Sequence, residues 1–238
     1  MKSNMKADVK PESLIGAPSF GEKLIRLVYP PKCMVCGAVL DDDTPLYLCD
    51  ACHKLLPVCG SGFHKMSALP YIRGLFGAFH YAEGVDGAIR KMKFGNQPGL
   101  SKTLAFLVYE ELMKEAVLPD FELIIPVPMH RRKKRRRGYN QSELVARELS
   151  RYLDIPVDSG ILLKTRYTRP QSRLKREQRL HNMDNAYKLS NDGDITGKII
   201  LLVDDVVTTG TTLNTCAKIL YENGASRIYA AVIAIAEK

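Results

Sequence analysis

Short apolar runs alternate along the chain with segments in which apolar residues recur every three or four positions. The runs are typical of buried strands, and the recurring positions are typical of amphipathic helices. This alternation predicts an α/β fold, a mostly parallel sheet with flanking helices. We expect strands over 76–81, 123–128, 198–203 and 228–235, and helices over 85–94, 100–114, 144–153 and 212–222.

The pattern changes near residues 60–70, where we place a domain boundary. Residues 1–20 are polar and contain Pro11 and Pro18, which predicts a flexible N-terminal tail. Residues 21–65 form a small cysteine-containing module, and residues 66–238 carry the alternating pattern. A chain of 238 residues has room for one ordinary domain with a small appendage.

No segment of the chain predicts a membrane span. The longest apolar run, 228–236, is about half of the roughly 18 residues that a spanning helix needs. The N-terminal residues are basic, but acids and Pro11 follow them instead of the apolar stretch of a secretory signal. We therefore expect a cytoplasmic protein.

Four of the six cysteines form two CxxC pairs, Cys33 with Cys36 and Cys49 with Cys52. Two such turns can supply the four thiolates of a closed structural Zn²⁺ site. A redox CxxC motif normally stands alone at a helix start after a strand, unlike either pair here. An iron–sulfur cluster is the main alternative, so we predict zinc with a role in folding this small region.

The two remaining cysteines do not extend this pattern. Cys59 has no partner cysteine nearby; His53 and His64 are possible substitute ligands. We favour Cys59 as a turn residue and His53 as a solvated neighbour of the metal site. Cys216 lies in an apolar helical pattern and is predicted to be a core thiol.

The stretch 201–213 contains an apolar strand, then Asp204 and Asp205, then four threonines around Gly210. Carboxylates at the end of a buried strand lie where open α/β sheets bind ligands, and there they can meet hydroxyl groups or a metal. Small residues let backbone amides surround a phosphate, and the helix that follows adds its positive end. This combination favours a sugar phosphate.

The stretch has three other interpretations. It can be a strand-to-helix turn with an acidic cap, the acidic pair of an ATPase, or the acidic start of a receiver domain. The ATPase requires a GxxxxGK[ST] loop, which the sequence lacks, and a receiver has no comparable threonine cluster. Phosphate binding explains the whole stretch.

The net charge of +9 comes from one part of the chain. Residues 1–60 and 61–130 are each neutral, residues 131–181 carry a net +11, and residues 182–238 carry −2. Seven consecutive cations open the segment 131–181, namely Arg131, Arg132, Lys133, Lys134, Arg135, Arg136 and Arg137.

This basic run has three interpretations. It can bind the backbone of single-stranded DNA, with Tyr139 stacking on a base. It can attract an anionic ligand to the neighbouring site. It can also be a solvated loop without a partner.

The stretch 201–213 resembles the phosphoribosyl pyrophosphate (PRPP) signature of type I phosphoribosyltransferases. Together with the cysteine module, Pro126–Pro128 and Arg137–Gln141, it makes the chain from about residue 24 similar to the ComF family of bacterial competence proteins. That family often has a second cysteine group, of which only Cys59 and Gly60 are present, so we expect one metal site.

The resemblance implies roles for individual residues. Asp204 and Asp205 would be the catalytic acids and face the ribose hydroxyls, often with Mg²⁺ near. The remaining PRPP contacts would come from a 5′-phosphate loop and a pyrophosphate loop, Thr208, Thr209, Gly210, Thr211 and Thr212 in the first and Val127, Pro128, Met129, His130 and Arg131 in the second. A mobile hood over 166–182 would close over the substrate with Arg166, Arg169, Gln171, Arg173, Lys175, Arg176 and Arg179.

These features lead to three hypotheses. The first is a cytoplasmic accessory of DNA uptake that binds PRPP with Mg²⁺, or a related phosphoribosyl ligand, and contacts single-stranded DNA and proteins of the uptake machinery. The second is an active phosphoribosyltransferase, in which pyrophosphate leaves from a cation-stabilised transition state. The third is a PRPP sensor without catalysis. The sequence offers no distinctive element for recognising an acceptor base.

Overall fold

The computed structural model describes residues 11–16, 18–60, 62–65, 68–82, 84–166, 186–190 and 193–236. Its centre is a sheet of four parallel strands in the order β1-β6-β5-β2. The strands are β1 (Gly74–His80), β2 (Leu123–Pro126), β5 (Ile199–Val207) and β6 (Arg227–Ile235). The predicted parallel sheet is confirmed.

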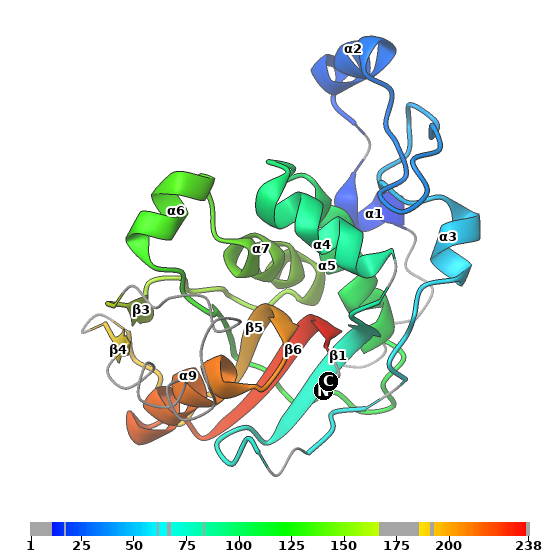
Figure 1. The fold of residues 1–238 in the computed structure, drawn as a ribbon. Coiled ribbons are helices and arrows are strands. Elements are labelled where there is room, and N and C mark those ends of the chain that lie inside the picture. The colour runs from blue at the N-terminus through cyan, green and yellow to red at the C-terminus, as the bar shows by residue number, and fades with distance from the viewer. Residues whose placement is uncertain are drawn as a thin grey trace.

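Helices cover both faces of this sheet, as Figure 1 shows. One face carries α4 (Val85–Phe94), α5 (Leu100–Leu112) and α7 (Gln141–Leu153), and the other carries α9 (Thr211–Glu222). Each face has its own cluster of buried apolar side chains. Cys216 is fully buried on α9, as its apolar surroundings in the sequence predict.

Strand β5 is longer than the sequence pattern predicts. It continues past Val203 through both aspartates, because Asp204 and Val206 pair in register with Val232 and Ala234 of β6. The two carboxylates therefore have the fixed geometry of a paired strand rather than that of a loop.

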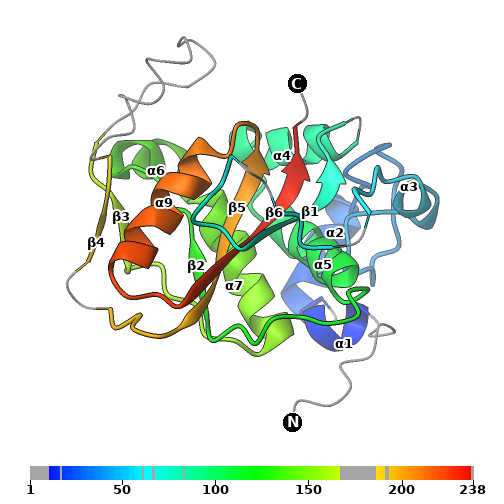
Figure 2. The same cartoon turned by 90° about the horizontal axis from the view of Figure 1, so that it is seen from below.

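The basic run and a pair of short strands are structured, which the sequence pattern does not predict. The basic run forms a short helix, α6 (Arg131–Arg137), which ends at Gly138 in a left-handed conformation (φ 88°). Strands β3 (Leu162–Lys164) and β4 (Tyr187–Leu189) pair antiparallel, and Figures 1 and 2 both show them beside α9. Each of these strands has only three residues, which is too short for a recognisable hydrophobic pattern in the sequence.

The N-terminal module contains α1 (Pro11–Ile15), α2 (Phe20–Val28) and α3 (Asp50–Lys54). Figures 1 and 2 place it at the opposite end of the molecule from the β3–β4 hairpin. The expected loose tail differs from the structure at α1, where Leu14 and Ile15 pack against the core.

The module and the sheet domain share one hydrophobic core. Met34, Leu46, Leu48 and Leu56 belong to the same buried cluster as the inner faces of α4 and α5. Polar contacts cross the same seam, since Tyr47 N donates to Thr103 Oγ1 at 3.0 Å and Lys91 Nζ donates to the Met34 carbonyl at 2.9 Å.

The chain that leaves the module also protects the edge of the sheet. His64 and Leu75 exchange two backbone hydrogen bonds of 2.9 Å, and the amide of His80 donates to the carbonyl of Pro57 at 2.7 Å. An uncovered edge strand would present unpaired amides and carbonyls to other chains. Isolated bridges from Val58 to Phe79 and from His64 to Leu75 thus cover part of the outer edge of β1.

Within the part of the chain that the structure describes, no helix combines the length and apolarity that crossing a membrane requires.

We expect the module to be energetically part of the domain. Leu56 is 8 % exposed in the shared core, whereas its neighbour Leu55 is 80 % exposed. L56A should therefore lower the free energy of unfolding by about 2–4 kcal/mol, whereas L55A should change it by less than about 0.5 kcal/mol. Urea denaturation followed by circular dichroism measures both. Equal stabilities for the two variants would contradict a shared core.

Candidate functional site

The four predicted metal ligands converge in the N-terminal module. The sulfur atoms of Cys33, Cys36, Cys49 and Cys52 all lie within 4.8 Å of one another, and Cys36 Sγ is 3.8 Å from Cys49 Sγ. A tetrahedral Zn²⁺ with Zn–S bonds of about 2.3 Å separates its sulfurs by about 3.8 Å. The donor set and its spacing therefore fit a closed four-thiolate metal site.

Backbone amides around this cluster favour thiolate at one position. Burial alone would raise the pKa of Cys33, but hydrogen bonds from the amides of Cys49, Cys36 and Val35 outweigh it and lower the pKa to about 6. His53 is not a solvated neighbour, because its Nε2 lies 2.8 Å from Oε2 of Glu110 on α5. This pair joins the module to the sheet domain.

The second site is a cleft of about 350 Å³ at the carboxyl end of β5. Asp204 forms its inner wall, where Oδ1 accepts from Ser142 Oγ at 2.7 Å and from the amide of Asp205 at 2.9 Å. Oδ1 of Asp205 lies 2.9 Å from Nζ of Lys93, which comes from the last turn of α4. Each carboxylate thus has a different partner, a hydroxyl for one and an ammonium for the other.

The environment of Asp204 disfavours its ionised form. Burial and the neighbouring charge of Asp205 raise the pKa of Asp204 to about 7, although Ser142 and Lys93 oppose the shift. Asp204 therefore gains and loses its proton near neutral pH, whereas Asp205 has the Lys93 ammonium beside it. A ligand with hydroxyl groups, or a cation, would supply the stabilisation that the ionised carboxylate of Asp204 lacks.

The threonine loop turns directly from β5 into α9. Gly210 has φ 71°, and a side chain there would lie 2.4 Å from Leu69 Cδ2, so both the backbone and the space require glycine. Thr209 Oγ1 and Thr211 Oγ1 are 2.9 Å apart. The loop encloses a small cavity of about 40 Å³, lined also by Asp204, at the positive end of a twelve-residue helix.

The wall opposite the acids is made by the segment after β2. Val127, Pro128, Met129 and His130 line the cleft, as the resemblance implies, and Asn140 Nδ2 holds this segment by donating to the Val127 carbonyl at 2.9 Å. Arg131, the last residue expected in this loop, instead lines a neighbouring cavity of about 580 Å³.

One buried polar group in this wall has no partner among the described residues. Gln141, the first residue of α7, is 1 % exposed and lines the cleft, and its Nε2 makes no hydrogen bond to a described atom. A buried amide without a partner is costly. A ligand oxygen in the cleft would satisfy it.

The basic run divides between the cleft and its surroundings. Lys133, Arg136 and Arg137 line the cleft, so part of the run faces the acidic pair. Lys134 is paired with Glu143 at 2.7 Å. The side chains of Arg131, Arg132 and Arg135 are exposed on the same short helix.

Several cleft residues were missed by sequence reasoning. Lys93, Ser142, Lys164 and Tyr187 come from four different elements, and Lys164 Nζ donates to Tyr187 Oη at 2.8 Å across the β3–β4 pair. Burial lowers the pKa of Lys164 and raises that of Tyr187. No local pattern marks them, since only the tertiary fold brings them together.

Of the expected hood, only Arg166 lies within the described residues. The other expected hood residues, Arg169, Gln171, Arg173, Lys175, Arg176 and Arg179, lie outside them. Strands β3 and β4 flank this segment in sequence.

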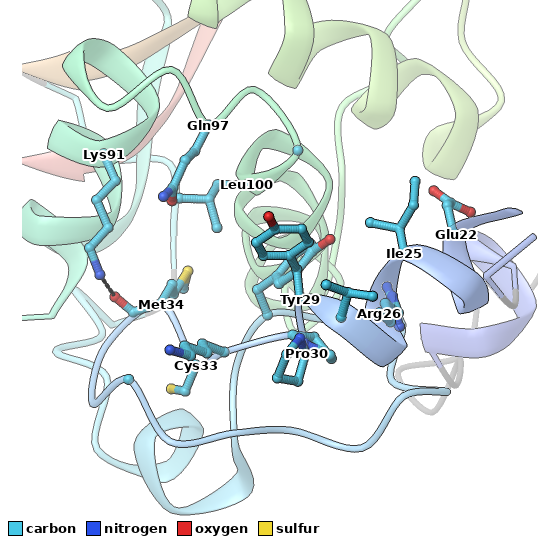
Figure 3. Close-up of a pocket in the computed structure, with 16 residues that line it drawn as sticks. Glu22, Ile25, Arg26, Tyr29, Pro30, Cys33, Met34, Lys91, Gln97 and Leu100 are labelled. Atoms are coloured by element: carbon cyan, nitrogen blue, oxygen red, sulfur yellow. Dashed lines mark hydrogen bonds between the residues drawn. The ribbon is translucent and has the colours of Figure 1, made fainter.

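A larger cavity of about 700 Å³ lies away from the acidic cleft, between α2, the cysteine module and the α4–α5 connection (Figure 3). Ile25, Tyr29 and Leu100 contribute apolar surface to it, as Figure 3 shows. Two of its basic groups donate to carbonyl oxygens, Lys91 to that of Met34 and Arg26 to that of Thr44 at 2.8 Å. It contains neither paired carboxylates nor a phosphate loop.

The chain is similar to a known family model and to several known proteins. Residues 140–238 match the family model of the phosphoribosyl transferase domain. The chain is 35 % identical to Competence protein F of Haemophilus influenzae, over 76 % of this chain and 87 % of that protein. It is 32 % identical to the DNA utilization protein YhgH of Escherichia coli K12, over 82 % and 86 %. Among solved structures, a purine phosphoribosyltransferase from Pyrococcus horikoshii aligns with 60 % of this chain and 75 % of its own, at 20 % identity and TM-score 0.34.

The cysteine cluster predicts one tightly bound metal ion per chain. We expect C52S to lose that ion and to lower the melting temperature by several degrees, because the four thiolates connect the segments of a module with little core of its own. Metal analysis and thermal denaturation measure the two effects. C59S, which removes a cysteine outside the cluster, should keep the ion. Visible absorbance of the purified protein would instead indicate an iron–sulfur cluster.

The raised pKa of Asp204 predicts a pH-dependent stability. The folded chain keeps a proton on Asp204 up to about pH 7, whereas an unfolded chain releases it near pH 4. The contribution of Asp204 to stability is therefore complete below about pH 4 and is lost as the pH rises to about 7. D204N should unfold like the wild type at pH 4 and be about 4 kcal/mol more stable at pH 8.

Urea denaturation in metal-free buffer at both pH values tests this expectation. D120N, at an exposed position, serves as the matched control and should show no such gain at pH 8. A D204N effect that is the same at both pH values would contradict the assignment of the titration to Asp204.

Proposed function

The chain belongs to the ComF family of competence-associated proteins, and from that premise we propose that it serves DNA uptake from the cytoplasmic side. Its phosphoribosyltransferase domain would bind PRPP with Mg²⁺, or a related 5′-phosphoribosyl ligand, and its basic helix would contact single-stranded DNA. The names of the relatives, a competence protein and DNA utilization proteins, support the biological context.

One observation carries the ligand assignment. A paired acidic strand end leads into a glycine and threonine loop at a helix N-terminus, and several cations line the same cleft. Hydroxyl groups, a terminal phosphate and a pyrophosphate occur together in PRPP, and each has a matching group in this cleft. A protein that bound only an isolated phosphate would have no use for the two carboxylates.

The residues of the cleft divide the ligand between them in this proposal. Asp204 and Asp205 would accept hydrogen bonds from the ribose hydroxyls, and the amides of Thr208–Thr212 would hold the 5′-phosphate. Lys133 and Arg136 would neutralise the pyrophosphate, and Gln141 would donate its unpartnered amide to a ligand oxygen. Mg²⁺, when bound with the ligand, would supply further charge neutralisation, with Asp204 and Asp205 as its carboxylates.

The outward arginines support the contact with single-stranded DNA. Arg131, Arg132 and Arg135 are exposed, and Lys134 is the member of the run already neutralised by an acid. Holding several like charges on one short helix is unfavourable without anions nearby. A phosphate backbone would offer these anions along the length of the helix.

Transferase activity is a second candidate, supported by the position of the cations. Lys133, Arg136 and Arg137 stand where a departing pyrophosphate would be neutralised, so the same groups that bind PRPP can stabilise its cleavage. Pyrophosphate release on addition of nucleobases or amines would establish the transferase. PRPP binding without any release would leave a sensor.

The division of the basic helix predicts two separable phenotypes. K133A/R136A should weaken PRPP binding at least about tenfold, because each cation makes a charge-assisted contact to the pyrophosphate. R131A/R132A/R135A should leave PRPP binding unchanged and weaken binding of an oligothymidine strand. The slope of log affinity against log salt should become shallower by about 2, the value for three lost phosphate contacts on a single strand.

Calorimetry with PRPP and MgCl₂ and fluorescence anisotropy with the labelled strand measure the two ligands on the same preparations. The triple variant is the control for the double variant with PRPP, since it removes more charge from the same helix. If it loses PRPP as strongly as the double variant, the run acts only through net charge. An unchanged salt slope would exclude the DNA contact.

A further inference from the structure

An exposed aromatic ring stands at the mouth of the acidic cleft. Phe94, the last residue of α4, is 76 % exposed. The guanidinium carbon of Arg137 lies 5.2 Å from the centre of its ring, in a cation–π contact. The ring is therefore oriented by a neighbour while most of its surface stays in water.

The surroundings of this ring are strongly cationic. Phe94 borders a cavity of about 460 Å³ that adjoins the cleft, together with Lys93, Asn96, Lys133, Arg136, Arg137 and Tyr139. Burial and the charge of Arg137 lower the pKa of Lys133, although the charges of Asp205 and Asp204 oppose the shift. Single exposed apolar side chains are common on proteins, but this one lies among four cations.

Tyr139 does not present its ring in the same way. Its hydroxyl donates to the carbonyl of Met92 at 2.5 Å, and its half-buried ring packs against the core. Tyr139 instead anchors the last turn of α4, which carries Lys93 and Phe94. Of the two rings that line this cavity, the exposed one belongs to Phe94.

We propose that Phe94 and Arg137 form a stacking platform for a nucleobase that is joined to phosphate. A flat aromatic ring beside cations matches one ligand chemistry, a heteroaromatic base joined to phosphate. The platform deepens the proposed function by naming the residue that holds a base next to the PRPP site. The nucleotide comes from a single strand or is a free nucleotide, and the experiment separates these sources.

The decisive comparison uses two strands of equal length, an oligothymidine and an abasic oligomer with the same phosphates. F94A should weaken binding of the oligothymidine at least about fivefold and leave the abasic oligomer unchanged, because stacking on an aromatic side chain contributes about 1–3 kcal/mol per base. Its salt slope should equal that of the wild type, since no charge is lost. F20A, which removes another highly exposed ring (81 %) on α2, should change neither strand.

Two further variants examine the platform directly. R137K keeps the charge but not the planar group, so it should reduce the preference for the oligothymidine over the abasic strand. The chain contains no tryptophan, so F94W introduces a single fluorophore that a stacked base should quench. F20W is its control and should not respond. Repeating the titration with thymidine monophosphate tests the free nucleotide as the source.

The outcomes distinguish this proposal from the broader function. Loss of both strands by F94A, or of neither, would overturn the platform while leaving the DNA contact in place. Response to the monophosphate alone would assign the platform to a free nucleotide and remove the strand contact. Failure of the wild type to bind any of these ligands would overturn the platform and the DNA contact together, while PRPP calorimetry decides the phosphoribosyl site independently.

Discussion

Two carboxylates held side by side at the end of a buried strand are the constraint on which the site depends. Because β5 and β6 continue their pairing through Asp204 and Asp205, the acids cannot move apart to relieve their repulsion. The protein compensates with Ser142 from α7 and Lys93 from α4, two helices on the same face of the sheet. The arrangement stays incompletely neutralised at Asp204, which suits a ligand that brings hydroxyl groups.

The metal module is connected to this constraint through α4. Lys91 of this helix donates to the Met34 carbonyl, next to Cys33 of the cysteine cluster, while Lys93 of the same helix pairs with Asp205. Met34 and Met92 also lie in one buried cluster. A metal held by the four cysteines would therefore stabilise the module and, through it, the helix that supplies both Lys93 and Phe94. The cysteine cluster therefore has a physical route to the cleft, although it lies on another part of the molecule.

The seven cations of the basic run have the same charge but different surroundings in the folded protein. As a string of seven cations it suggests a single anion-binding surface, but the helix α6 turns its members in different directions. Lys133, Arg136 and Arg137 face the cleft, and Lys134 is neutralised by Glu143. A short helix thus gives adjacent residues different electrostatic roles. This division is what allows ligand binding and strand binding to be separated by substitution.

The sequence by itself determined the parallel sheet, the grouping of the four cysteines and the continuous stretch from the acids through the threonine loop. These features are local, because apolar periodicity, CxxC spacing and a strand-to-helix turn each depend on neighbouring residues. The tertiary structure alone decided the partners of those groups. Lys93, Ser142 and Lys164 are far apart in the chain, and no periodicity marks them. Phe94 and Tyr139 show the same limit, since burial and a single hydrogen bond decide which ring remains exposed. Side-chain pairing, burial and charge compensation arise from packing between distant segments, so only the folded structure determines them.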